Sequence, residues 1–138
     1  MLLLGLSLFC EARSPAENYI IHCSGCHKSN GSGSQINLVP DIRNVVGYFT
    51  QVPDGRAYII QVADISQAPL PDDDLATLIN WTLYKFSKDQ LATHFKLYTE
   101  KEVKKLRNTR PADLHSVRRK LLVSLKQRGI QLPKYVRP

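Results

Sequence analysis

The most regular alternation of apolar and polar positions lies between residues 72 and 86. Apolar side chains recur there at intervals of three and four residues, which is the spacing of one helix face, and Trp81 and Tyr84 widen that face. Three aspartates follow Pro71 and suit the positive end of a helix dipole, so they predict a helix start rather than a metal site. The members of the stripe are Leu75, Leu78, Ile79, Thr82 and Phe86.

Two further amphipathic segments lie near the C-terminus. Thr99 and Glu102 have the spacing of a capping box, which predicts a helix from residue 99 to about 108. After Pro111, apolar residues again recur with helical spacing and predict a helix that ends at Gly129. The apolar stripe of this last helix consists of Leu114, Val117, Leu121 and Leu125.

The N-terminal part predicts one clear helix, over residues 15–23, and several less regular segments. Residues 29–34 are rich in Ser, Gly and Asn and predict a loop, and residues 47–51 predict a short helical segment. Residues 56–62 fit a helix or a strand equally well. Residues 62–71 contain two prolines and no regular period, so they predict a loop. With no strand pattern that stands on its own, the predicted fold class is all-α.

The expected first helix ends in a motif with distinctive chemistry: Cys23 and Cys26 are separated by two residues, and His27 follows at once. Each thiol can add across one vinyl group of haem, and one helical turn places both sulfurs along the same porphyrin edge. His27 then lies under the iron as the proximal ligand. A zinc site would need four ligands, and a redox Cys pair would follow a strand. The motif therefore predicts one covalently attached haem c per chain. His22, next to the motif, is expected to face solvent.

Charge is distributed unevenly along the chain. Residues 1–84 contain four Lys and Arg against eight Asp and Glu, a net charge of −4, whereas residues 85–138 contain fifteen against four, a net charge of +11. A basic tail on a mildly acidic domain predicts an electrostatic partner. We expect an acidic redox protein, with peripheral contact to an anionic membrane surface as the alternative. Nucleic acid is not an expected partner.

The N-terminus has the features of a leader. Leu2 to Phe9 form an apolar run that is too short to span a bilayer, and Cys10-Glu11-Ala12 fits a small-x-Ala cleavage site. Residues 1–12 are therefore predicted to be a signal peptide, and the protein is predicted to be exported. A lipoprotein that keeps Cys10 as its acylated residue is the alternative.

Residues 15–90 resemble a class I c-type cytochrome. Tyr19 stands four residues before the first motif cysteine, like the family's aromatic contact between its first and last helices, and Trp81 and Tyr84 stand where that last helix would cross. Pro40-Asp41-Ile42 is similar to the family's Pro-x-Leu, whose proline carbonyl accepts the second N–H of the proximal histidine.

The resemblance implies a helical haem domain over residues 15–90, a basic helical extension over residues 97–138, and a periplasmic or otherwise exported location. It implies that the haem-binding residues are Cys23, Cys26, His27, Pro40 and Ile42.

One departure from the family concerns the sixth iron ligand. Class I members carry a distal methionine before the last helix, but this chain has one methionine, Met1, inside the predicted leader. The corresponding loop, residues 62–69, offers no strong iron ligand. The site is therefore expected to be open or water-bound, or to take a weaker or more distant ligand. The candidates are Gln61, Gln67, His94, His115 and, if retained, Cys10.

These features lead to two functional hypotheses. The first is an exported monohaem cytochrome that carries single electrons, alone or as the cytochrome subunit of a dehydrogenase, without breaking bonds in a substrate. The second is an open-site haem protein that binds a small ligand such as NO or peroxide, with His94 as the one candidate distal acid–base residue. No Ser/His/Asp grouping or phosphate loop supports a hydrolase or an NTPase.

Overall fold

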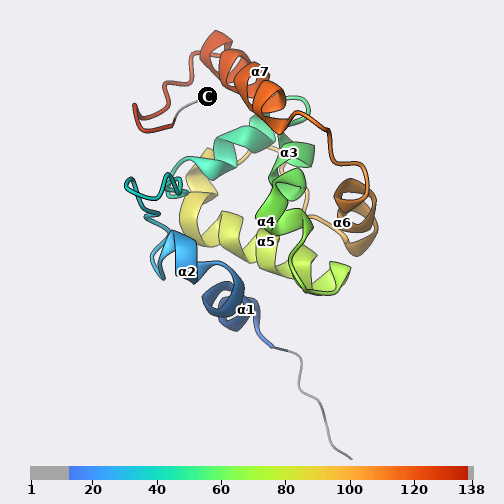
Figure 1. The fold of residues 1–138 in the computed structure, drawn as a ribbon. Helices are drawn as coiled ribbons and strands as arrows, with labels where there is room; N and C mark the ends of the chain where they lie inside the picture. Colours follow the sequence, from blue (N-terminus) through green and yellow to red (C-terminus); the bar gives the residue numbers. More distant parts are fainter. Residues whose placement is uncertain (1–12, 137–138) are drawn as a thin grey trace, which may run out of the picture.

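The computed structural model describes residues 13–136 (Figure 1). Within this range the chain is helical, with one isolated bridge between Ser34 and Val39 and no strand, which confirms the all-α class. The predicted signal peptide, with Met1 and Cys10, lies outside the described residues. In chain order the helices are α1 (Pro15–His22), α2 (Ser24–His27), the 3₁₀ helix η1 (Val46–Gln51), α3 (Gly55–Gln61), α4 (Ala63–Ser66), α5 (Asp72–Ser87), the 3₁₀ helix η2 (Lys88–Gln90), α6 (Glu100–Arg107) and α7 (Leu114–Gln127).

Helix α1 begins with a capping box. The Ser14 hydroxyl accepts a hydrogen bond from the backbone N–H of Glu17, and the Glu17 carboxylate accepts one from the backbone N–H of Ser14. Pro15 occupies the first turn, where its missing N–H costs nothing. The helix ends at His22, and Cys23 then serves as both the C-cap of α1 and the N-cap of α2. The Cys motif therefore lies where two short helices meet.

Helix α5 crosses α1, and aromatic rings fill the crossing. Tyr19 is 1% exposed, and its ring centroid lies 5.5 Å from that of Trp81 and 5.1 Å from that of Phe86. Four of the five predicted stripe residues of α5 are buried, and the fifth, Thr82, is half-buried. Tyr84 is 45% exposed, so the prediction that it widens the apolar face was wrong. Leu83, on the other side of the stripe, is buried instead.

The segment at residues 56–62, which the pattern left undecided, forms helix α3. Tyr58, Ile59, Ile60 and Gln61 are all buried because η1, α4, α6 and α7 surround this helix. Burial on every side removes the polar face that would have revealed its period. The expected loop after it contains one helical turn, α4.

The C-terminal extension shares the core of the preceding helices. Helix α6 packs against α3 and α5, and α7 packs against α3 and η1 (Figure 1). Val103 and Leu125 are fully buried, and Leu121 is 3% exposed. The apolar stripe of α7 is thus covered by the chain's own helices. Gly129 follows α7 with φ of +78°, as expected for a glycine that ends a helix. No helix among residues 13–136 is long and apolar enough to cross a membrane.

Candidate functional site

The Cys motif forms one tight turn. The backbone N–H groups of Cys26 and His27 both donate to the Cys23 carbonyl, at 3.3 and 2.9 Å. Cys23 is half-buried, Cys26 is exposed, and neither forms a disulfide. Burial raises the pKa of the Cys23 thiol to about 11, and the nearby Cys26 adds to the shift. One turn therefore carries two thiols that are available to form a covalent bond with another group.

The ring of His27 has one nitrogen committed and one available. Its Nδ1 lies 3.1 Å from the carbonyl oxygen of Pro40, which can only accept, so Nδ1 carries the proton and Nε2 keeps its lone pair. Burial lowers the pKa of His27, although the bond to Pro40 and the charge of Asp64 oppose the shift. A neutral imidazole with a free Nε2 is the form that ligates a metal. The contact with Pro40 is the one that the family resemblance implies.

A closely packed turn holds Pro40 in place. Gly33 has φ of +64°, and its N–H donates to the His27 carbonyl at 3.1 Å. A Cβ atom on Gly33 would lie 2.4 Å from the Val39 oxygen and 2.5 Å from the Pro40 oxygen. Ser34 and Val39 exchange two backbone hydrogen bonds, at 3.0 and 2.8 Å. The Gly-rich segment that the sequence marked only as a loop therefore sets the position of the His27 acceptor.

Ile42 and its neighbours continue this ordered segment. The N–H of Ile42 donates to the Gly31 carbonyl at 3.0 Å, and its side chain packs against the core. Asp41 pairs with Arg43 at 2.7 Å, and the hydrogen bond from that guanidinium lowers the pKa of the Asp41 carboxyl. The predicted Pro40–Ile42 segment thus lies next to the motif turn in a defined conformation.

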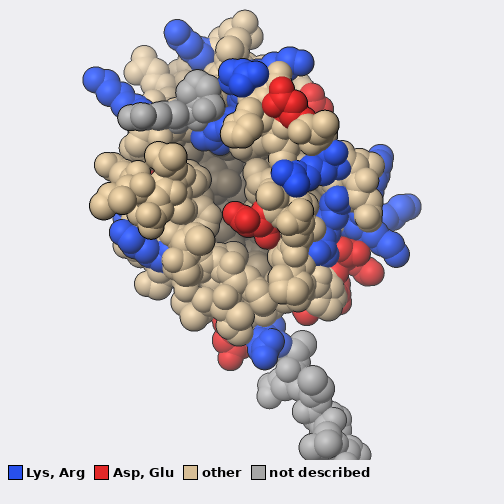
Figure 2. Space-filling view, viewed as in Figure 1, with Lys and Arg blue, Asp and Glu red and all other residues tan. Residues whose placement is uncertain are grey.

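Figure 2 shows a hollow near the centre of one face of the molecule. In the same view, Figure 1 places it among η1, α3, α4 and α5. Asp64 on α4 lies near enough to His27 for its charge to act on the imidazole. Helix α4 therefore lies near the motif turn and beside the hollow.

The candidate sixth ligands among the described residues lie on different elements and differ in exposure. Gln61 is 6% exposed, and its amide donates to the Thr109 carbonyl at 3.0 Å. Its side chain is therefore hydrogen-bonded to the extension. Gln67, His94 and His115 are exposed. Among the described residues, no group of three or more His, Cys, Asp or Glu side chains is arranged to hold a metal ion. Attachment of haem c requires no such group, because the thiols bond to carbon and not to iron.

His22 is half-buried, whereas it was expected to face solvent. Its Nε2 is buried and has no hydrogen-bond partner among the described residues. Two oxygens nearby in the fold are also buried without a hydrogen-bond partner among the described residues: Oδ1 of Asn18, one turn earlier on α1, and Oγ1 of Thr82 on α5. Position 22 shares a helix face with position 18, and Asn18 is 3% exposed, so His22 lies on a buried side of α1.

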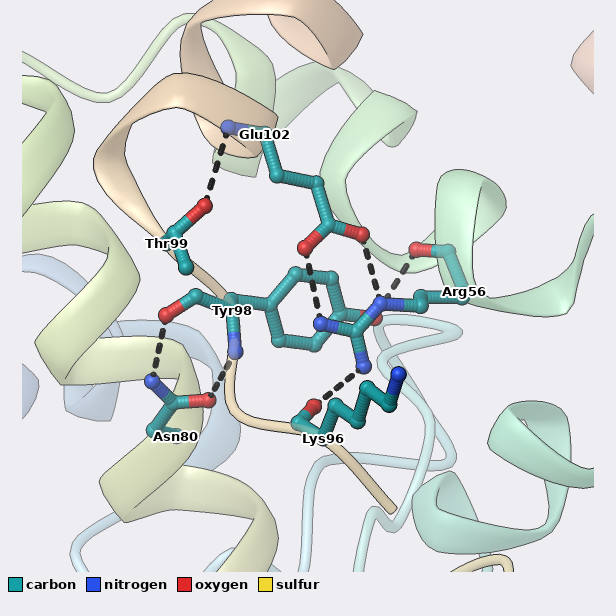
Figure 3. A network of polar contacts seen from close by, with 6 residues as sticks. All are labelled: Arg56, Asn80, Lys96, Tyr98, Thr99 and Glu102. Carbon is teal, nitrogen blue, oxygen red and sulfur yellow. Dashed lines mark hydrogen bonds and ion pairs between the residues drawn. The ribbon is translucent and has the colours of Figure 1, made fainter. Parts of the chain in front are cut away.

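Sequence analysis missed the polar groups that fix the extension. The guanidinium of Arg56 donates to both carboxylate oxygens of Glu102, at 2.5 and 2.8 Å, and to the Lys96 carbonyl at 2.5 Å (Figure 3). It also lies 3.8 Å from the ring centroid of Tyr98. Asn80 donates to the Tyr98 carbonyl and accepts from its N–H. Each partner lies 18 or more residues away along the chain, so local patterns carried no signal.

The capping box predicted for α6 is only half formed. Thr99 accepts from the Glu102 N–H at 3.3 Å, as expected. The Glu102 carboxylate binds Arg56 instead of reaching back to the Thr99 backbone, because a bidentate pair with a guanidinium is stronger than a bond to a neutral N–H.

The chain was also compared with known proteins. No protein family model matches it, and a search of curated proteins finds no match. The resemblance to class I c-type cytochromes therefore rests on the residues described above.

Proposed function

We propose that this protein is an exported monohaem c-type cytochrome that transfers single electrons. The hydrogen bond from His27 to Pro40 carries the proposal, because it leaves Nε2 free on the half-buried imidazole that directly follows the Cys pair. Burial lowers the pKa of this imidazole and favours its neutral form. Cys23 and Cys26 would hold the haem covalently, and His27 would be its proximal ligand. The bound haem would supply the one-electron Fe(III)/Fe(II) couple.

The packing around the motif is consistent with a class I cytochrome fold. Tyr19 meets Trp81 and Phe86 where α1 crosses α5. Its hydroxyl donates to the Lys28 carbonyl at 2.9 Å, just past the motif. The helix crossing thus braces the motif turn, and a hollow lies beside α4 (Figures 1 and 2). In this proposal the chain's own residues position the haem.

The small-ligand function remains the second candidate. Residues 62–69 contain no methionine, histidine or cysteine, and His94 and His115 are exposed. An iron with an open sixth position would bind CO or NO directly, and access to that position decides between ligand binding and electron transfer. One preparation of the holoprotein can be used to test both candidate functions.

The test is a redox titration of the holoprotein, produced in cells that attach haem c and followed by absorption. The electron-transfer function predicts a reversible transition that fits one electron. Exposure of the reduced protein to CO distinguishes the two candidates, since rapid and complete binding favours the small-ligand function. A holoprotein without a reversible transition would contradict the electron-transfer proposal.

A further inference from the structure

The loop that follows α4 has backbone acceptors that its own segment cannot satisfy. Helix α4 ends at Ser66, and Pro69 and Pro71 prevent the next residues from continuing it. Ala68 is 8% exposed, so its carbonyl is largely removed from water. Buried carbonyls need hydrogen-bond partners. The Ala68 carbonyl accepts from the nearby Leu70 N–H at 2.8 Å, and further donors to this loop come from a distant part of the chain.

Arg107, in the last turn of α6, supplies these partners. Its Nε donates to the Ser66 carbonyl at 2.8 Å, its Nη2 to the Ala68 carbonyl at 2.6 Å, and its Nη1 to the Leu70 carbonyl at 3.0 Å. Nη1 also pairs with Asp72 at 2.9 Å. One guanidinium thus binds three alternate carbonyls of the loop and the first residue of α5. Only arginine presents enough N–H donors in one plane to do this.

The helix that carries Arg107 is itself firmly placed. Val103 is fully buried in the core, and Glu102 holds Arg56 on α3 (Figure 3). Just past the helix, the Thr109 carbonyl accepts from the Gln61 amide. Both ends of α4 and its loop are therefore tied to the same short stretch of the extension.

We propose that Arg107 is a positioning residue that holds residues 66–72 beside the distal side of the haem pocket, so that α6 controls the access of small ligands to the iron. The proposal rests on the proposed function for the haem itself. Its geometric basis is that α4 borders the hollow (Figures 1 and 2) and that Arg107 binds the carbonyls of Ser66, Ala68 and Leu70 directly after it. In the absence of a distal methionine, a side chain of the extension then takes over the ordering of this loop.

The test compares Arg107→Lys with Arg110→Lys in the full-length holoprotein. Lysine keeps the charge but cannot bind three carbonyls at once. Arg110 is exposed, so the same change there serves as the matched control. The first readout is amide hydrogen exchange in residues 63–71. We expect it to accelerate about tenfold or more in Arg107→Lys, because the loop loses charge-assisted hydrogen bonds that oppose its opening.

The second readout is the rate of CO binding to the reduced holoprotein after flash photolysis, which we expect to rise several-fold in Arg107→Lys and to stay unchanged in Arg110→Lys. Unchanged loop exchange would overturn the positioning role. Faster loop exchange with an unchanged CO rate would show that the loop does not guard the iron, which also overturns the proposal. Exchange that accelerates equally in α1 and α5 would indicate general destabilisation, and it would count against a local role.

A preparation with no covalent haem would refute the proposed function and, with it, control of access to iron. The exchange readout would then still report separately whether Arg107 holds the loop. The two failures are therefore distinguishable.

Discussion

The motif turn and the extension use polar groups in opposite ways. In the motif turn, two thiols form no disulfide, and His27 uses only one ring nitrogen for its bond to Pro40. Where the extension meets the preceding helices, Arg56 on α3 and Arg107 on α6 are saturated with carboxylate and carbonyl partners. Groups left available on an ordered turn are suited to binding or reaction, whereas saturated groups hold elements together. The comparison separates the candidate site from the structure that supports it.

The two regions also differ in charge, and the structure refines which charges face outward. Arg118, among the basic residues of α7, does not simply face outward. Its Nη1 instead donates to the Tyr58 hydroxyl at 3.1 Å, and its guanidinium lies 5.7 Å from the Phe49 ring centroid. Arg119, Lys120 and Lys126 are exposed. Any docking role of this helix therefore belongs to these three residues and not to Arg118.

The largest expected effect concerns the backbone of the motif region. Gly33→Ala forces an alanine into φ of +64° and places its Cβ 2.4 Å from the Val39 oxygen. We expect a loss of roughly 3 kcal/mol in the free energy of unfolding, because strain of about 1–2 kcal/mol from the left-handed conformation adds to the steric overlap. Denaturant unfolding measures it.

Gly129→Ala is the control for Gly33→Ala. It has a similar φ of +78°, but a Cβ there meets nothing within 4 Å, so it isolates the conformational cost. Equal losses in both variants would mean that contact with the Pro40 segment is unimportant.

The second prediction tests the outward charge of the extension. Reversal of Arg119, Lys120 and Lys126 to Glu should slow electron transfer to an acidic partner by about tenfold at low salt, because complementary charge raises the encounter rate. Added salt should shrink the difference, and the haem spectrum should not change. Stopped-flow mixing with the reduced protein gives the rates. Identical rates for mutant and parent at low salt would rule out docking through this face.

The third prediction concerns the ion pair between Arg56 on α3 and Glu102 on α6, which links α3 to the extension. Glu102→Gln removes the charge that pairs with Arg56, whose side chain is 28% exposed. We expect a loss of about 1 kcal/mol, since solvent screens part of the interaction. Glu100→Gln, at an exposed position in the same first turn, is the matched control and should cost only a few tenths of that. Thermal unfolding measures both, and equal shifts would argue against a structural role for the Arg56–Glu102 pair.

Sequence patterns predicted the elements whose determinants are local. Helices α1, α6 and α7 begin with side-chain caps, α5 begins with an acidic first turn, and all four lie close to the expected bounds. The pattern also located the Cys motif, and the resemblance paired His27 with Pro40. The sequence pattern failed where the burial of a side chain, or its contact partners, depends on distant segments. Tyr84 contacts Phe95, at 6.1 Å between ring centroids, instead of the core.

The long-range hydrogen bonds of Arg56 and Arg107 could not be predicted for the same reason. The acceptors of Arg107 lie 35 to 41 residues before it, and nothing in the local sequence distinguishes it from the exposed basic residues around it. Helix α4 was missed because a single turn of four residues has no measurable period.

The most direct test of the central claim is the mass of the denatured holoprotein after extraction with acidic acetone. The proposal predicts one haem retained per chain, attached to the peptide that contains Cys23 and Cys26. Replacement of either cysteine by Ala should weaken the attachment, and replacement of both should abolish it. Haem that is fully extracted from the parent protein, or a parent chain that never acquires haem, would contradict the proposal.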